Sequence, residues 1–190
     1  MQEKLSFHLD NKPSGIYIES KNLKIKYFEH YFNSKECQFY FQELLEKTSW
    51  NDPNSISWGR NKPYKRGVAW YGDEKKVYSY SGITVKPFPW NSVLIEIKNK
   101  IEKAFPVEYN SVLLNDYVTG DIGMGWHSDD EKELGYNPII GSVSFGAERD
   151  FYLKHKTEKD LEKIEIVLKN GSFLVMYGST QKYWQHHIPA

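Results

Sequence analysis

A histidine and an aspartate two residues apart, His127 and Asp129, follow a glycine-rich turn, and a histidine pair, His186 and His187, lies near the end of the chain. Residues i and i+2 of an extended segment point to the same side, so His127 and Asp129 can reach one ion together. Two imidazoles and one carboxylate form the facial triad that holds non-haem iron(II) and leaves positions open for a co-substrate and dioxygen (O2). The single cysteine, Cys37, does not supply the thiolates that favour zinc.

The residues alone leave the third ligand open. A histidine close to an aspartate is more often a hydrogen-bonded surface pair, and the long spacing from Asp129 to His186 is permissive only. On one strand His186 and His187 point to opposite sides, so only one of them can face a metal.

The elements that must position these residues follow from hydrophobic periodicity. Period-two patterns predict strands at 23–28, 68–71, 77–80, 111–118, 139–145, 150–155, 163–168, 172–177 and 184–188, and Asn170-Gly171 predicts a two-residue hairpin. One helix is predicted from an N-cap at Ser34 to near Lys47. A second is predicted from an N-cap at Asn91 or Ser92 to Phe105. Two helices followed by many strands predict an α+β fold with a double-sheet barrel packed on the helices.

Composition limits the class of protein. Lys+Arg and Asp+Glu are both 25, so no global charge attracts nucleic acid, and any such contact needs a local patch. The one basic cluster is at residues 60–66, with Tyr64 inside it and Trp58 before it. It is either a solvated surface loop or a site of phosphate contact and stacking. No apolar leader or membrane span is found, so we expect a soluble, intracellular protein.

Several motifs occur in a fixed order along the chain. They are Tyr71-Gly72-Asp73, YSYSG at 78–82, Asn115-Asp116-Tyr117, HSDDE at 127–131, SVSFGA at 142–147, RDF at 149–151, GSFLVM at 171–176 and WQHHIP at 184–189. Together they resemble the AlkB family of iron(II)- and 2-oxoglutarate-dependent dioxygenases, particularly its eukaryotic-type DNA-repair branch. The likeness covers roughly residues 25–189.

The resemblance implies a double-stranded β-helix (jelly-roll) core with the N-terminal helices packed on one sheet, and it selects His186 as the third ligand. The implied iron ligands are His127, Asp129 and His186, and the implied 2-oxoglutarate contacts are Asn115 and Tyr117. The implied lining of the base pocket is Tyr78, Tyr80, Asp130 and Glu131. Arg149 is expected to pair with an acidic residue near the site.

The implied reaction is oxidative demethylation of N-alkylated bases, such as 1-methyladenine and 3-methylcytosine, releasing formaldehyde and succinate. These bases are cationic, and tyrosine faces and carboxylates favour a cationic ring. The expected nucleic-acid contacts are Trp58, Arg60, Lys62, Lys65 and Arg66. The expected partner is alkylated DNA or RNA, bound by a monomer that is cytoplasmic in a bacterium or nuclear in a eukaryote. Two alternatives are an oxygenase acting on a protein or lipid, and a non-catalytic nucleic-acid-binding homologue.

In the family another strand follows the distal histidine and carries an arginine that pairs with the distal carboxylate of 2-oxoglutarate. The sequence ends at Ala190, and none of its arginines, Arg60, Arg66 and Arg149, occupies that position. Two explanations are open: truncation of an active enzyme, or a short homologue with weakened co-substrate binding. We expect an arm at 1–22 and a single, truncated dioxygenase domain at 23–190 that lacks its last strand.

Overall fold

The computed structural model describes residues 14–50, 66–74, 78–80 and 83–190, with only the backbone described for 78–80 and 83–85. The strands are β1 Ile16–Ser20, β2 Leu23–Phe28, β3 Gly67–Gly72, β4 Tyr78–Tyr80, β5 Ile83–Val85, β6 Phe88–Pro89, β7 Ser111–Asp116, β8 Met124–His127, β9 Ile140–Ser144, β10 Arg149–His155, β11 Ile164–Leu168, β12 Ser172–Tyr177 and β13 Trp184–Ile188. The helices are α1 Ser34–Lys47, α2 Ser92–Glu102 and α3 Thr180–Tyr183, with a 3-10 turn at Lys132–Leu134.

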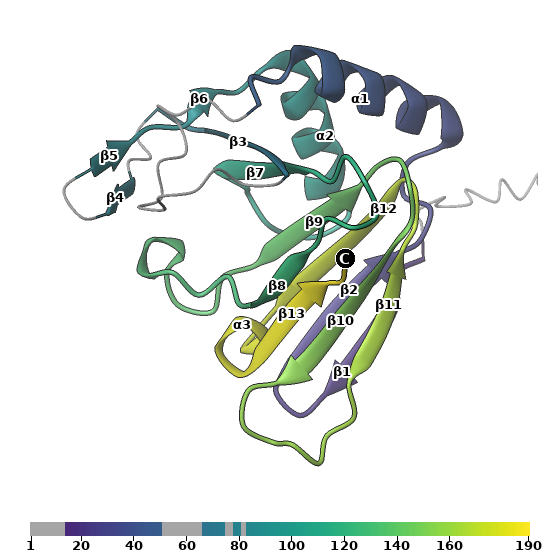
Figure 1. The fold of residues 1–190 in the computed structure, drawn as a ribbon, viewed down its shortest axis with the longest axis vertical. Coiled ribbons are helices and arrows are strands. Elements are labelled where there is room, and N and C mark those ends of the chain that lie inside the picture. Colours follow the sequence, from purple (N-terminus) through teal and green to yellow (C-terminus); the bar gives the residue numbers. More distant parts are fainter. Residues whose placement is uncertain (1–13, 51–65, 75–77, 81–82) are drawn as a thin grey trace, which may run out of the picture.

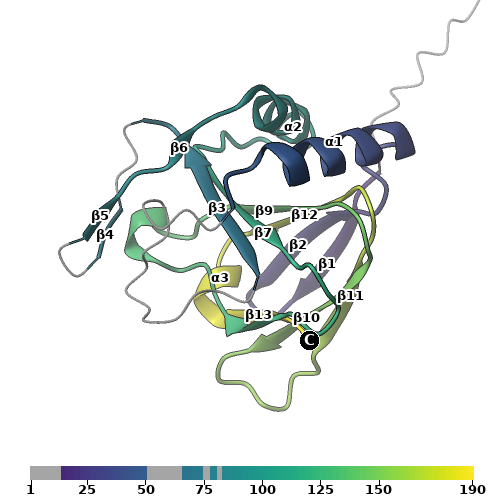
Figure 2. The same cartoon turned by 45° about the horizontal axis from the view of Figure 1, so that its top comes forward.

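Two four-stranded antiparallel sheets form the body of the fold, one in the order β1-β2-β12-β9 and the other in the order β11-β10-β13-β8. A three-stranded sheet, β6-β3-β7, and the β4-β5 pair complete the described strands. Figures 1 and 2 show α1 and α2 together on the side of the β1-β2-β12-β9 sheet that faces away from β10 and β13. The predicted α+β class, with several antiparallel sheets, is confirmed.

Alternation along β12 divides the core into two layers. Leu174 and Met176 pack between the two larger sheets with Leu153 and Trp184. The intervening residues, Phe173 and Val175, pack with side chains of α1 and α2 in a second cluster that contains Cys37, Tyr40, Val93, Ile97 and Ile101. Burying one such aliphatic side chain contributes about 1.5–3 kcal/mol, so both layers hold β12 in register.

Both predicted long helices are present, and each begins at an asparagine cap. Asn33 accepts hydrogen bonds from the amides of Lys35 and Glu36, and the Glu36 side chain accepts one from the Asn33 amide. The predicted cap at Ser34 is therefore one residue late. Asn91 caps α2 by accepting from the Leu94 amide.

The structure corrects part of the predicted N-terminal arm at 1–22. Residues 16–20 form β1, which pairs antiparallel with β2, and Ile18 packs against the core between the sheets. The strand was missed because it lies at a sheet edge and is largely exposed. Residues 1–13 lie outside the described part of the chain.

The predicted hairpin at Asn170-Gly171 is wrong. A tight turn is present, since the Ser172 amide donates to the Lys169 carbonyl and Gly171 has a φ of 77°. However, β11 pairs with β10, whereas β12 pairs with β2 and β9, so the turn crosses between sheets. The Asn-Gly pattern reports local backbone geometry and carries no information about which strand becomes the neighbour.

Among the described residues, no helix has both the length and the apolar character needed to cross a bilayer.

Candidate metal centre

Strands β8 and β13 bring the three expected ligands together. His127 is the last residue of β8 and lies opposite His186 of β13 in the antiparallel pairing, with 4.1 Å between the ring centroids. Asp129 follows β8, and its carboxylate oxygens lie 3.8 Å from His127 Nε2 and 3.4 Å from His186 Nε2. The three ligand atoms lie within 4.8 Å of one another, so they can bind one ion.

Hydrogen bonds fix the orientation of this cluster. His127 Nδ1 lies 2.8 Å from the Gly125 carbonyl oxygen, which selects the tautomer with Nδ1 protonated and leaves the Nε2 lone pair for a metal. The Asp129 amide donates to Gln181 Oε1 at 2.9 Å. The Ser128 hydroxyl donates to the Trp184 carbonyl at 2.8 Å, which ties the loop after β8 to the start of β13.

The electrostatics of the cluster suit a cation. Burial, helped by the proximity of His127, lowers the pKa of His186 to about 3, so its ring is neutral and can act as a ligand. Burial also raises the pKa of Asp129 to about 6; His127 opposes this shift, and Glu131 and Asp130 add to it. A carboxylate in such a place is costly without a positive partner, and a divalent ion would supply one. The donor set and its environment therefore fit Fe(II).

His187 is directed away from the three ligands. Its ring stacks on Trp126 with 4.8 Å between centroids, and its Nδ1 contacts the Met124 carbonyl oxygen at 2.7 Å. The predicted alternation of His186 and His187 about the strand is therefore seen.

The expected co-substrate residues lie beside two arginines. Arg66 Nε donates to Asn115 Oδ1 at 2.7 Å. The Arg149 guanidinium lies 5.3 Å from the centroid of the Tyr117 ring. Burial raises the pKa of the Tyr117 hydroxyl, while the positive charges of Arg66 and Arg149 lower it, so both cations are close to this ring. Two arginines, Arg66 and Arg149, thus lie beside Asn115 at the end of β7 and Tyr117 just after it. We call these four residues the positively charged cluster around β7.

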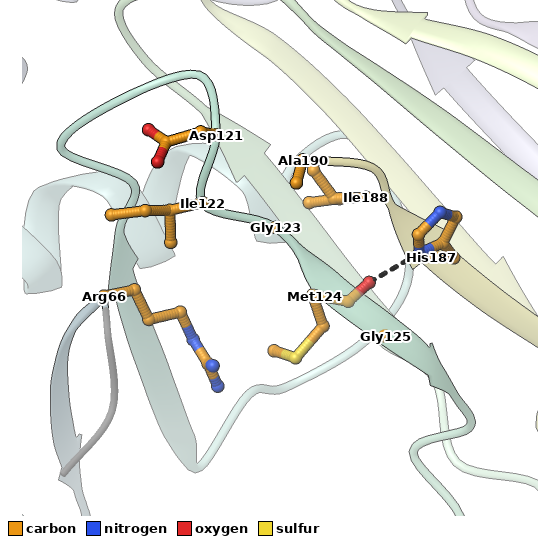
Figure 3. Close-up of a pocket in the computed structure, with 9 residues that line it drawn as sticks. All are labelled: Arg66, Asp121, Ile122, Gly123, Met124, Gly125, His187, Ile188 and Ala190. Carbon is orange, nitrogen blue, oxygen red and sulfur yellow. Dashed lines mark hydrogen bonds between the residues drawn. The ribbon is translucent and has the colours of Figure 1, made fainter.

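A pocket of about 280 Å³ adjoins this cluster, and Figure 3 shows the Arg66 side chain extending into it opposite Met124. The lining residues are Arg66, Asp121, Ile122, Gly123, Met124, Gly125, His187, Ile188 and Ala190. Arg66 is half-buried and bonded to Asn115, so it lies beside the expected co-substrate residues, and its expected contact with nucleic acid stays a prediction.

The prediction for Arg149 needs a second correction. Its Nη2 donates to the carbonyl oxygens of Ile122, at 2.9 Å, and Pro189, at 2.5 Å. Within the described part of the chain its hydrogen bonds thus go to main-chain oxygens, where an acidic side chain was expected. Arg149 instead fastens the loop before β8 to the residues after β13.

The remaining expected residues are only partly described. Asp130 is half-exposed and forms an ion pair with Lys156 at 2.8 Å, and Glu131 is exposed. The backbone of Tyr78 and Tyr80 forms β4 beside β5, and their side chains lie outside the described part. The predicted nucleic-acid contacts Trp58, Arg60, Lys62 and Lys65 also lie outside it.

Sequence reasoning missed Gln181 and Lys156. Gln181 reaches Asp129 from α3, and Lys156 reaches Asp130 and the Gln181 carbonyl from just after β10. Neither residue has a motif or a spacing relative to the ligands that could have identified it, because both contacts depend on how the two sheets pack.

Comparisons with known proteins agree with this site. A family model described as the 2OG-Fe(II) oxygenase superfamily matches residues 24–190. Human alpha-ketoglutarate-dependent dioxygenase alkB homolog 3 is 35% identical over 96% of this chain and 64% of that protein. The bovine form is 38% identical over 82% of this chain and 56% of its own length, so the chain spans under two thirds of these relatives. Human DNA oxidative demethylase ALKBH2 is 33% identical over 93% of this chain and 71% of that protein.

The solved structure of OsALKBH1 superposes with a TM-score of 0.60, covering 92% of this chain and 87% of that one at 15% identity. At this identity the match establishes the fold alone, and it implies the double-stranded β-helix. The family description includes both iron(II) and 2-oxoglutarate, which are therefore the cofactor and co-substrate of this class. The match over most of the chain, the coverage of ALKBH2 and the His-Asp-His cluster together show that the chain belongs to the AlkB homologues of the 2OG-Fe(II) oxygenase superfamily.

Proposed function

We propose that the chain is the catalytic domain of an oxidative demethylase that removes N-linked methyl groups from bases of the 1-methyladenine and 3-methylcytosine type in nucleic acid. The observation that carries the proposal is the cluster of His127, Asp129 and His186, held on two paired strands in a chain one third identical to proteins named as DNA oxidative demethylases. One 2-oxoglutarate, one O2 and one N-methyl group would give succinate, carbon dioxide, formaldehyde and an N–H group.

His127, Asp129 and His186 would bind the Fe(II), which supplies the oxidising chemistry. The Gly125 carbonyl keeps His127 in the tautomer that presents Nε2 to the ion. Burial keeps His186 neutral, so no proton needs to leave this ring before it coordinates. These groups are in place before the ion binds, which reduces the cost of assembling the site.

The positively charged cluster around β7 would hold the 2-oxoglutarate. Asn115 offers an amide and Tyr117 a hydroxyl, and the charges of Arg66 and Arg149 lie close to the Tyr117 ring. A dicarboxylate needs such charge-assisted donors when it leaves water. Arg66 is the arginine that lines the pocket, so we assign it to a co-substrate carboxylate.

The methylated base would lie on the side of Asp130 and Glu131. Both carboxylates are close enough to Asp129 to raise its pKa, so they place negative charge beside the metal centre, which favours a cationic base. Tyr78 and Tyr80 would supply ring faces for the flipped base, and residues 58–65 would contact the nucleic-acid backbone.

An anaerobic titration with Fe(II) and 2-oxoglutarate tests the proposal. The wild-type chain should develop the visible metal-to-ligand charge-transfer band, and His127→Ala should not. On admission of O2, an oligonucleotide with 1-methyladenine should release formaldehyde in step with succinate, and the unmethylated oligonucleotide should not. Absence of the band in the wild type would contradict the enzyme assignment, and a band with succinate release that no methylated oligonucleotide stimulates would contradict the substrate.

A further inference from the structure

Gln181 is a fully buried polar side chain next to the metal centre. It lies on α3, between β12 and β13, and is 1% exposed. Its side-chain oxygen accepts a hydrogen bond from the Asp129 amide at 2.9 Å, and its side-chain nitrogen donates to the sulfur of Met176 at 3.4 Å. The amide orientation follows from these partners, because only its oxygen can accept from a main-chain N–H.

This side chain is expensive to keep in the core. Removing an amide from water is unfavourable unless strong hydrogen bonds replace those to water, and a thioether is a weak acceptor. A methionine would fill a similar volume without that cost. The hydrogen bond from the Asp129 amide is therefore the contact that offsets the free-energy cost of burying the Gln181 side chain.

The loop that carries Asp129 is fastened on both sides of that residue. The Ser128 hydroxyl donates to the Trp184 carbonyl. On the other side, Lys156 Nζ bridges Asp130 Oδ2, at 2.8 Å, and the Gln181 carbonyl, at 2.9 Å. Three successive loop residues are thus tied to the segment formed by α3 and the start of β13, which also carries His186.

We propose that Gln181 is a positioning residue of the metal centre. By holding the Asp129 amide, it fixes the main chain from which the carboxylate reaches towards His127 and His186, so the carboxylate does not have to be ordered when the ion binds. Lys156 supports the same arrangement by securing the α3 main chain to Asp130. This role rests on the proposed function only through the identity of Asp129 as a ligand.

The test compares Gln181→Met with Thr180→Val by titrating each metal-free protein with Co(II) and following its visible absorption. Thr180 is a matched control, since it is equally buried on the same helix but bonds to Lys24 and Tyr177, away from Asp129. Removing a residue that holds a metal ligand in place weakens metal binding by about 10- to 100-fold, so we expect that loss and an altered Co(II) spectrum in Gln181→Met. Thr180→Val should lower the unfolding temperature and keep the wild-type Co(II) affinity and spectrum.

Lys156→Met is a second variant at an exposed position, in case Gln181→Met does not fold. Loss of its two bonds should weaken Co(II) binding by less than about tenfold. Wild-type Co(II) affinity in Gln181→Met, or in Lys156→Met if Gln181→Met does not fold, would overturn the positioning role, as would equal weakening in Thr180→Val. Failure of the wild-type chain itself to bind Co(II) would instead overturn the assignment of the metal centre.

Discussion

The two faces of the β11-β10-β13-β8 sheet have opposite characters, although successive residues of the same strands build them. On the inner face His186 of β13 lies opposite Leu153 of β10, and on the outer face His187 lies opposite Tyr152. His186 is 6% exposed, and burial lowers its pKa. His187 stacks on the half-buried Trp126.

The contrast shows that the chemistry of a histidine here is set by the side of the strand it occupies. Both rings have a neighbour on β8, but only the inner one meets Asp129. A shift of one residue in the pairing of β13 would turn His186 to the outer face, away from Asp129. The apolar contacts that set this register are therefore part of the metal site.

The largest expected difference between the two faces is seen when each histidine is removed in turn. His186→Ala should abolish the charge-transfer band with Fe(II) and 2-oxoglutarate, because the cluster loses one of three ligands. His187→Ala should keep the band at saturating 2-oxoglutarate, because its ring stacks on Trp126 and is directed away from the three ligands. His187 also borders the pocket, so only the 2-oxoglutarate concentration needed to form the band should change. Circular dichroism checks that both variants fold, and a band lost in His187→Ala but kept in His186→Ala would reverse the assignment.

The next largest effect concerns the packing beneath the inner face. Leu153 is 0% exposed, and Leu153→Ala should lower the free energy of unfolding by about 2–5 kcal/mol, since it leaves a cavity between the sheets. Val167 of β11 is 42% exposed, and Val167→Thr should change stability by no more than about 0.5 kcal/mol. Urea unfolding measures both changes, and equal losses would show that the faces are not packed differently.

Local patterns in the sequence predict which of the candidate ligand side chains share one side of a strand. Alternation separates His186 from His187, and the His127/Asp129 spacing on an extended segment brings two ligands to one side. The strand β8 itself was not predicted, because four residues with a glycine among them give too short a period-two pattern. Local patterns predicted His127, Asp129 and one of two histidines as ligands, and the family resemblance selected His186. The strand β8, which carries His127, could not be predicted.

Contacts between distant segments explain the other failures. Arg66 belongs to a basic cluster in the sequence for which only a nucleic-acid contact was predicted, and the pairing of β3 with β7 also places it against Asn115. Gln181 bonds to Asp129 across 52 positions of sequence. No periodicity encodes such contacts, because they arise when the sheets close on one another.

On the inner face, the Co(II) affinity should depend on pH through Asp129, with an effect of intermediate size. Burial raises the pKa of Asp129 to about 6, so below that pH a proton competes with the metal for the carboxylate. Co(II) affinity should be constant with respect to this group above pH 6 and fall by about tenfold per unit below it, because each bound metal then displaces a proton. Glu131→Gln removes a charge that raises this pKa, so the fall should begin at lower pH; an unshifted or upward-shifted onset would contradict the charge coupling.

The smallest expected effect lies on the outer face, at Lys154. Its Nζ is 4.2 Å from the centroid of the Trp126 ring, an arrangement worth about 0.5–1 kcal/mol at an exposed site. Lys154→Met keeps most of the side-chain volume and removes the charge, so unfolding in urea should shift by no more than that amount. The Co(II) affinity and spectrum should stay at their wild-type values, because the change is on the side of the sheet opposite Asp129. A weakened metal site in Lys154→Met would mean that the stack of Trp126 on His187 holds β8 and β13 in register for the inner face, and the two faces would then be coupled.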